Sequence, residues 1–96
     1  MNSAETHIAS LVVHCRPEQA EGAAASIAAW PGAEIHTTTP EGKLVVILEM
    51  AREADILATM DRIRELPGVL NTSLVFHHAE PTEALDEIVE PRGENS

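Results

Sequence analysis

The sequence contains few aromatic and few basic side chains. Trp30 and Phe76 are the only aromatic residues among 96, and six Lys and Arg residues stand against sixteen Asp and Glu residues. The resulting formal charge of −10 excludes a surface that follows phosphate groups, because such a surface needs clustered Lys and Arg. Two aromatic rings cannot form a base-stacking platform either. Nucleic acid is therefore excluded as the main partner.

Long apolar runs and cysteine are also scarce. The longest aliphatic run, residues 44–48, is far shorter than the roughly 20 residues that a membrane span needs. Residues 1–7 contain neither the basic run nor the apolar stretch of a signal peptide. Cys15 is the single cysteine, so an internal disulfide and a thiolate metal cage are excluded. These features predict a cytoplasmic protein with one small hydrophobic core.

Residues that could support catalysis are present but poorly arranged. All five glycines are isolated, which excludes a Gly-rich phosphate loop. Cys15 follows His14, but neighbouring side chains on a strand project to opposite faces, so the pair lacks the geometry for proton transfer. Arg16 follows the first predicted strand, as in an acylphosphatase anion loop, yet no glycine-rich segment surrounds it. The sequence therefore predicts no enzymatic activity.

The five histidines do not have the spacing of a metal site. The Cys-x-x-Cys and His-x-x-x-His patterns that hold zinc or copper are absent from the sequence. His77 and His78 are adjacent on a predicted strand, so they point to opposite faces and cannot easily share an ion. We therefore predict neither a metal nor another cofactor.

An internal repeat with an offset of 36 residues organises the chain. Pro31-Gly32 recurs as Pro67-Gly68, and the aliphatic run 7–15 recurs as 43–51. Between them, apolar residues recur at the i, i+4, i+7 and i+10 spacing of one helix face. Each half therefore predicts a strand, a helix, a Pro-Gly stop and a second strand. The matched helix positions are Ala20, Ala24, Ile27 and Trp30 in the first half and Ile56, Met60, Ile63 and Leu66 in the second.

The order of these elements predicts an α+β fold of the ferredoxin-like βαββαβ type. Right-handed crossovers place both helices on one face of a four-stranded antiparallel sheet, with the first and third strands in its centre. Residues 1–5 are predicted to be flexible, residues 6–78 to form the domain, and the acidic residues 79–96 to be disordered. The predicted strands are 6–15, 33–39, 43–51 and 69–78, and the predicted helices are 17–30 and 53–66.

The charged residues of the third strand predict which sheet face is covered. Lys43 and Glu49 share their parity with Val45 and Ile47, and charges avoid the face beneath helices. We therefore expect these residues on the open face, which is the sheet face without helices. The repeat transfers the same parity to the first strand. The resulting prediction places Leu11 and Val13 on the open face, Ser10 beneath a helix, and Leu44, Val46 and Leu48 in the core.

The last strand permits either assignment, because Val69 and Val75 oppose Leu70, Leu74 and Phe76 in parity. An open face with aliphatic side chains and carboxylates at its rim suits a peptide that is apolar and basic, and an edge strand can add main-chain pairing. The alternative partner is a second copy of the chain, which would form a homodimer through the same face. The residues alone leave both partners open.

Five strings stand in a distinctive order and spacing along the chain. They are Ser10-Leu11-Val12-Val13, Trp30-Pro31-Gly32, residues 44–49, Pro67-Gly68-Val69 and Ser73-Leu74-Val75-Phe76-His77. Together they resemble the NapD family, the small cytoplasmic chaperones of periplasmic nitrate reductase assembly. The resemblance covers about residues 7–78, which is nearly all of the predicted fold.

The resemblance implies a chaperone that is not an enzyme and carries no cofactor. Members of this family bind the twin-arginine signal peptide of the nitrate reductase catalytic subunit precursor, and they delay its export through the Tat pathway until the molybdenum cofactor is inserted. On this interpretation Glu49 meets an arginine of the peptide, aliphatic side chains supply buried area, and His77 contacts the peptide at the rim. The predicted peptide-binding residues are Leu11, Val13, Val45, Ile47, Glu49 and His77.

Two other functions are alternatives on the same fold. An ACT-like small-molecule sensor would dimerise and bind an amino acid at the interface, rather than a basic peptide. A metal-handling ferredoxin-like domain would take up copper or zinc, and it would lose the metal on substitution of Cys15 or His14.

Overall fold

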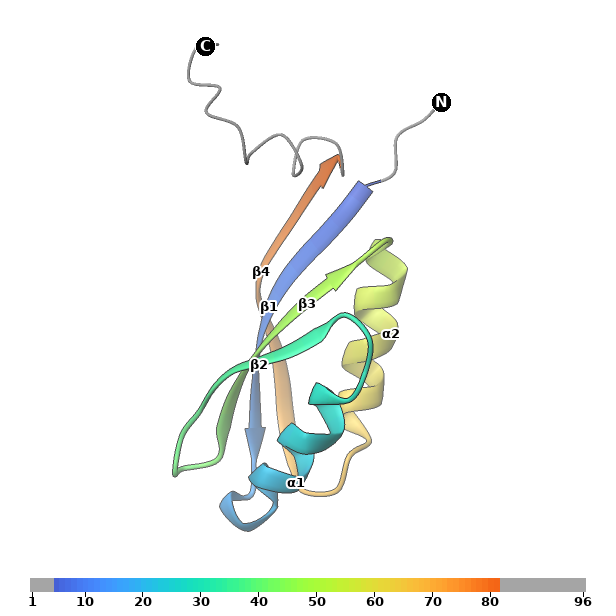
Figure 1. The fold of residues 1–96 in the computed structure, drawn as a ribbon. Coiled ribbons are helices and arrows are strands. Elements are labelled where there is room, and N and C mark those ends of the chain that lie inside the picture. The colour runs from blue at the N-terminus through green and yellow to red at the C-terminus, as the bar shows by residue number, and fades with distance from the viewer. Residues whose placement is uncertain (1–4, 82–96) are drawn as a thin grey trace, which may run out of the picture.

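The computed structural model describes residues 5–81 (Figure 1). Apart from Glu5, which belongs to the first strand, the predicted flexible N-terminus lies outside the described residues. The predicted acidic tail lies outside them from residue 82 onward. The elements in chain order are β1 (Glu5–Cys15), α1 (Pro17–Ala28), β2 (Ala33–Thr38), β3 (Lys43–Met50), α2 (Glu53–Arg64) and β4 (Val69–Pro81).

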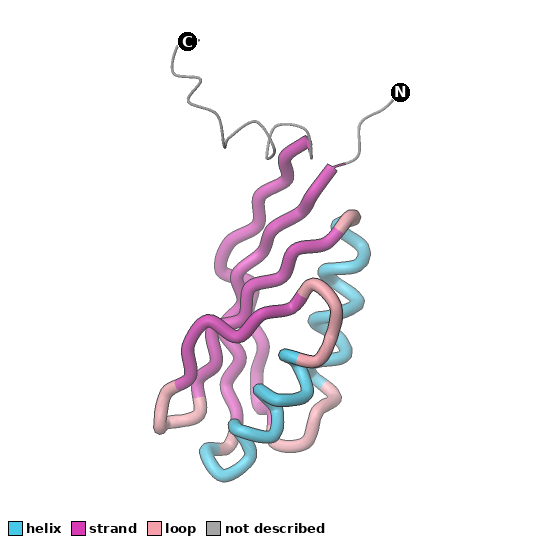
Figure 2. The backbone as a smooth tube through the Cα atoms, in the orientation of Figure 1, coloured by secondary structure: helices cyan, strands magenta, loops and turns pink. Residues whose placement is uncertain are grey.

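The four strands form one antiparallel sheet in the order β2-β3-β1-β4. Both helices pack on the same face of this sheet, as Figures 1 and 2 show. The central strands are therefore β1 and β3, and the two edge strands are β2 and β4. This arrangement confirms the predicted ferredoxin-like α+β fold and the predicted central strands.

The hydrophobic core lies between the sheet and the helices. On β1 every second residue from His7 to Cys15 is buried, which is the period of a strand with one covered face. On each helix the buried residues recur at the spacing of one helix face. The largest fully buried side chains are Leu11, Val13, Ile27, Leu44, Val46, Leu48, Ile56 and Ile63.

Local chemistry explains where the two helices begin and end. Pro17 opens α1, a position at which its missing N–H is not needed. α2 has acidic residues in its first turn and basic residues in its last turn, which suits the helix dipole. Each helix ends two residues earlier than predicted, because its last turn tightens into hydrogen bonds between residues three apart. Within residues 5–81, neither helix is long and apolar enough to cross a membrane.

Two glycines join three loops at one end of the sheet. The N–H of Cys15 donates to the carbonyl of Gly42, and the N–H of Arg16 donates to the carbonyl of Gly68, both at 2.8 Å. Gly42 has a φ of +102°, and a Cβ atom there would collide with the carbonyl oxygen of Cys15. The β2–β3 turn and the α2–β4 link are thereby fixed against the start of α1.

β4 is longer and less regular than predicted. It ends at Pro81, three residues past the predicted end. Its pairing with β1 shifts twice, once at Val75 and once at Leu70. Each shift is a β-bulge, in which one extra residue of β4 has no direct partner on β1. The alternation of side chains along β4 is therefore interrupted at both positions.

Candidate functional site

The open face carries a band of half-buried side chains along the two central strands. Residues that pair directly across an antiparallel ladder share a sheet face. All members of the band are half-buried except Glu49, which is exposed. The band therefore offers apolar area with a carboxylate at one end. Its cross-strand pairs are Ile8 with Glu49, Ser10 with Ile47, and Val12 with Val45.

The prediction of which residues lie on the open face is confirmed for β3 and wrong for β1. Val45, Ile47 and Glu49 lie on the open face, since they alternate with fully buried core residues of the same strand. Leu11 and Val13, in contrast, have no exposed surface and lie in the core beneath the helices. These two residues therefore support the sheet and cannot contact a partner on the open face.

A one-residue difference between the two halves explains this error. Arg16 alone links β1 to α1, whereas residues 51–52 link β3 to α2. As a result, α1 and α2 begin 36 residues apart, but β1 and β3 end 35 residues apart. A shift of one residue moves every side chain of a strand to the other sheet face. Ser10, expected beneath a helix, consequently lies on the open face.

A shallow hollow on the open face lies between the ends of β2 and β3. It measures about 200 Å³ and is lined by Gly32, Ala33, Glu34, Ile47 and Glu49. We call it the Glu34–Glu49 hollow after its two exposed carboxylates. Two carboxylates beside an aliphatic side chain suit a guanidinium group on an apolar stem. Sequence reasoning missed Glu34. The signal that could have found it was the short link between the predicted strands 33–39 and 43–51, which makes them antiparallel neighbours.

The carboxylates of this hollow form no ion pair within the described part of the chain. Neither Glu34 nor Glu49 is a partner in any ion pair of residues 5–81. Three arginines are instead occupied by contacts of α2, where they hold helical carboxylates or an aromatic ring. The contacts are Arg52 with Asp55 at 3.3 Å, Arg64 with Asp61 at 2.8 Å, and the Arg62 guanidinium carbon at 4.0 Å from the Trp30 ring centroid.

Three residues of β4 extend the open face to the edge of the sheet. Phe76 and His78 pair with open-face residues of β1, and their ring centroids lie 6.1 Å apart. The Nε2 atom of His78 lies 2.7 Å from Oε2 of Glu80. The other oxygen of Glu80, Oε1, is buried without a hydrogen-bond partner. These side chains add an aromatic surface and a third carboxylate. The sequence left the face of Phe76 open and assigned Glu80 to the predicted disordered tail, whereas the structure places Glu80 in β4.

His77 lies on the helix-bearing face of the sheet, since it pairs with the core residue Ala9. Its Nε2 atom lies 3.0 Å from Nδ1 of His7, and the ring planes are 26° apart, so the two rings share one hydrogen bond. Oε1 of Glu5 lies 3.3 Å from the other ring nitrogen of His7. His77 therefore connects β4 to β1. The predicted central position of the first strand, which leaves the last strand as one of its neighbours, was the signal for this contact.

Reactive groups are not gathered in this part of the chain. Cys15 is buried, and this burial raises the pKa of its thiol, so the reactive thiolate is disfavoured. Among the described residues, no group of three or more His, Cys, Asp or Glu side chains could hold a metal ion.

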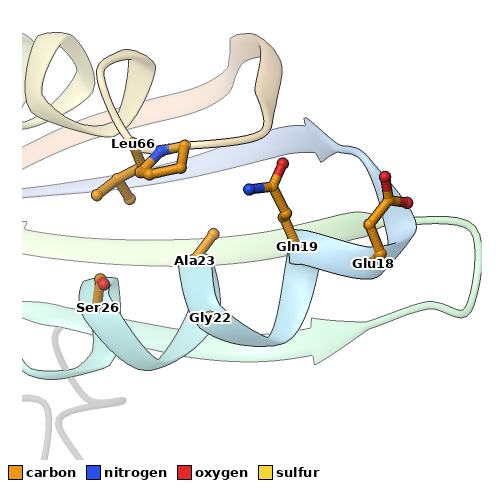
Figure 3. A pocket seen from close by; sticks show the side chains of 7 residues that line it. Glu18, Gln19, Gly22, Ala23, Ser26 and Leu66 are labelled. Carbon is orange, nitrogen blue, oxygen red and sulfur yellow. The ribbon is translucent and has the colours of Figure 1, made fainter.

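Another hollow lies on the helix-bearing side, between α1 and the link from α2 to β4 (Figure 3). It measures about 350 Å³ and is bordered by the small residues Gly22, Ala23 and Ser26 of α1. A Cβ atom at Gly22 would meet nothing within 4 Å. Glu18 is the only charged residue of its lining. The hollow is thus a gap left by small side chains, and it is separate from the open face.

The fold and the open face together define a small ferredoxin-like binding domain with an apolar, carboxylate-flanked sheet surface. The family model described as "NapD protein" matches residues 6–81. The chain belongs to the NapD family of chaperones, as the resemblance predicted.

Curated relatives and a solved structure agree with this assignment. The chain is 32% identical to "Chaperone NapD" of Escherichia coli (strain K12) over 74 residues, which cover 76% of this chain and 85% of the relative. It is 34% identical to "Chaperone NapD" of Paracoccus pantotrophus over 77 residues, which cover 80% and 68%. The solution structure of the E. coli Tat proofreading chaperone protein NapD matches with a TM-score of 0.70 and 31% identity, over 80% of this chain and 82% of that one.

Proposed function

We propose that this chain binds the twin-arginine signal peptide of the periplasmic nitrate reductase catalytic subunit precursor and delays its export through the Tat pathway until the cofactor is inserted. Family membership supports this proposal over the ACT-like sensor and the metal-handling domain. The observation that carries it is the open face, on which apolar side chains border two carboxylates that take part in no ion pair among residues 5–81.

A signal peptide of this type has a basic end followed by an apolar stretch, and the open face offers a complement to each part. The Glu34–Glu49 hollow suits arginine, because carboxylates form charge-assisted bidentate hydrogen bonds with guanidinium groups. The half-buried side chains of Ile8, Val12 and Val45 suit the apolar stretch. The formal charge of −10 attracts a basic peptide from a distance and increases the association rate.

On this proposal the chain acts in the cytoplasm, before translocation, and its role is binding without catalysis. The buried Cys15 thiol, the only one in the sequence, fits such a role because it is protected from reaction. Delay of export then follows from occupancy, since a signal peptide held on the open face is not available to the translocase.

Titration calorimetry with a synthetic peptide of the cognate twin-arginine signal sequence tests the proposal. Wild-type chain should bind this peptide, and Glu49→Gln should weaken the affinity about tenfold, because one hydrogen bond to a charged group is lost. Glu41→Gln is the matched control, since Glu41 is an exposed carboxylate in the β2–β3 turn, outside the hollow. Unchanged affinity of Glu49→Gln would remove Glu49 from the site. Absence of binding by the wild-type chain would refute the proposed function.

A further inference from the structure

Exposed apolar side chains are concentrated on one edge of the sheet. Among residues 5–81, five large hydrophobic side chains are exposed, and four of them lie on β4. The fifth is Leu57 of α2, and the other edge strand, β2, has none. Residues 69–79 of β4 also contain no Asp, Glu, Lys or Arg. The four exposed residues of β4 are Leu70, Leu74, Val75 and Phe76.

An edge strand of this composition is a hazard unless a partner covers it. Natural proteins protect sheet edges with short strands, charged side chains or Pro. β4 is instead 13 residues long, and its two bulge residues, Val75 and Leu70, are both more than 60% exposed. The bulges interrupt pairing in register with another sheet edge, while their side chains present apolar area. β4 is therefore better suited to contact a partner through its side chains than through main-chain pairing.

The register places Phe76 of this edge and the Glu34–Glu49 hollow at opposite sides of the open face, whereas Leu74 pairs with the core residue Leu11 and lies on the helix-bearing face. Phe76, Ser10, Ile47 and Glu34 are successive partners in a single row across all four strands. Strands lie about 4.8 Å apart, so the backbones at the two ends of the row are roughly 14 Å apart. The row thus runs from a carboxylate on β2 to an aromatic ring on β4.

We infer that β4 is the subsite for the apolar stretch of the bound peptide, and that the peptide crosses the sheet from the Glu34–Glu49 hollow to Phe76. This inference rests on the proposed function and adds the position and direction of the peptide. Electrostatic complementarity favours the peptide over a second copy of the chain as the partner bound at β4. Two copies would bring together two formal charges of −10, whereas the peptide carries its positive charge only at the end that meets Glu34 and Glu49.

Double-mutant cycles with three synthetic peptides test this direction. The parent peptide carries the cognate twin-arginine sequence, the second has both arginines replaced by glutamine, and the third has the leucines of its apolar stretch replaced by serine. Phe76→Ser should weaken binding of the parent peptide about tenfold and have less than about a twofold effect on the serine peptide. Glu49→Gln should show the reverse selectivity, with little effect on the glutamine peptide. Leu57→Ser is the control for loss of an exposed apolar side chain elsewhere.

A crosslinking measurement on the unaltered chain makes the test independent of variant folding. A benzophenone in the apolar stretch of the parent peptide should label residues 69–81, and one beside the arginines should label β2 or the end of β3. The reverse labelling pattern would overturn the inference, and so would equal parent-peptide affinities for Phe76→Ser and Leu57→Ser. Loss of self-association in Phe76→Ser with unchanged peptide affinity would assign β4 to a second copy. In all three cases the wild-type chain still binds the peptide, so the proposed function stands.

Discussion

The two edge strands occupy equivalent places in the internal repeat, but their surfaces differ. β2 has six residues, mostly exposed, with Glu34 and His36 among them. β4 has 13 residues and no charge between positions 69 and 79. A short polar edge resists pairing with other chains, while a long apolar edge invites contact. The comparison teaches that the two edges of this sheet offer different chemistry, a carboxylate on β2 and an apolar surface on β4.

The largest expected change in stability concerns β1, the strand that joins β4 to the rest of the sheet. Leu11 of β1 pairs with Leu74 of β4 and is fully buried. Leu11→Ala should lower the free energy of unfolding by about 3 kcal/mol, because it leaves a cavity in the core. Ile47→Ala on the open face should cost clearly less, since that residue is only half-buried. Urea unfolding of both variants measures the difference. Equal costs would contradict the assignment of Leu11 to the core.

An intermediate change in stability is expected at the side-chain contact that connects β4 to β1. His77→Ala should lower stability by about 1 kcal/mol near neutral pH, because it removes the 3.0 Å hydrogen bond to His7. Thermal unfolding at neutral pH is the measurement. His36→Ala is the control, since His36 is an exposed histidine of the other edge strand, β2. Equal costs for the two variants would show that the contact between the His7 and His77 rings does not stabilise the attachment of β4.

The smallest change in stability should accompany a charge placed on the apolar edge. Val75 and His36 are the bulge residues of β4 and β2, and both are exposed. Val75→Lys should change the free energy of unfolding by less than about 0.5 kcal/mol, yet reduce light scattering by concentrated protein. His36→Lys should leave scattering unchanged. If the two variants scatter alike, the two edges do not differ in their tendency to associate.

The repeat and the element order predicted the fold well, because they depend on local patterns. Pro-Gly stops, helix-face spacing and aliphatic runs each fix one element, and their order leaves one common topology. On β3 the open face was predictable, since Glu49 and Lys43 mark the parity that cannot lie beneath helices.

The rest of the candidate site depends on register, which the sequence does not display. One extra residue before α2 was enough to assign Leu11 to the wrong face. The bulges at Leu70 and Val75 break the alternation of β4, so no parity rule could assign Phe76. The contact between His7 and His77 joins residues 70 apart in sequence. Such contacts follow from strand pairing and become visible only in the folded chain.

The pairing of the first strand with the last has a consequence for synthesis of the chain. β1 lies between β3 and β4, so one side of this central strand stays without its partner until the ribosome has released residues 69–81. The start of α1 also waits for Gly68, whose carbonyl accepts the N–H of Arg16. Long-range pairing of this kind is completed late in folding. The complete sheet therefore forms only after synthesis of the domain has ended, and shorter nascent chains lack it.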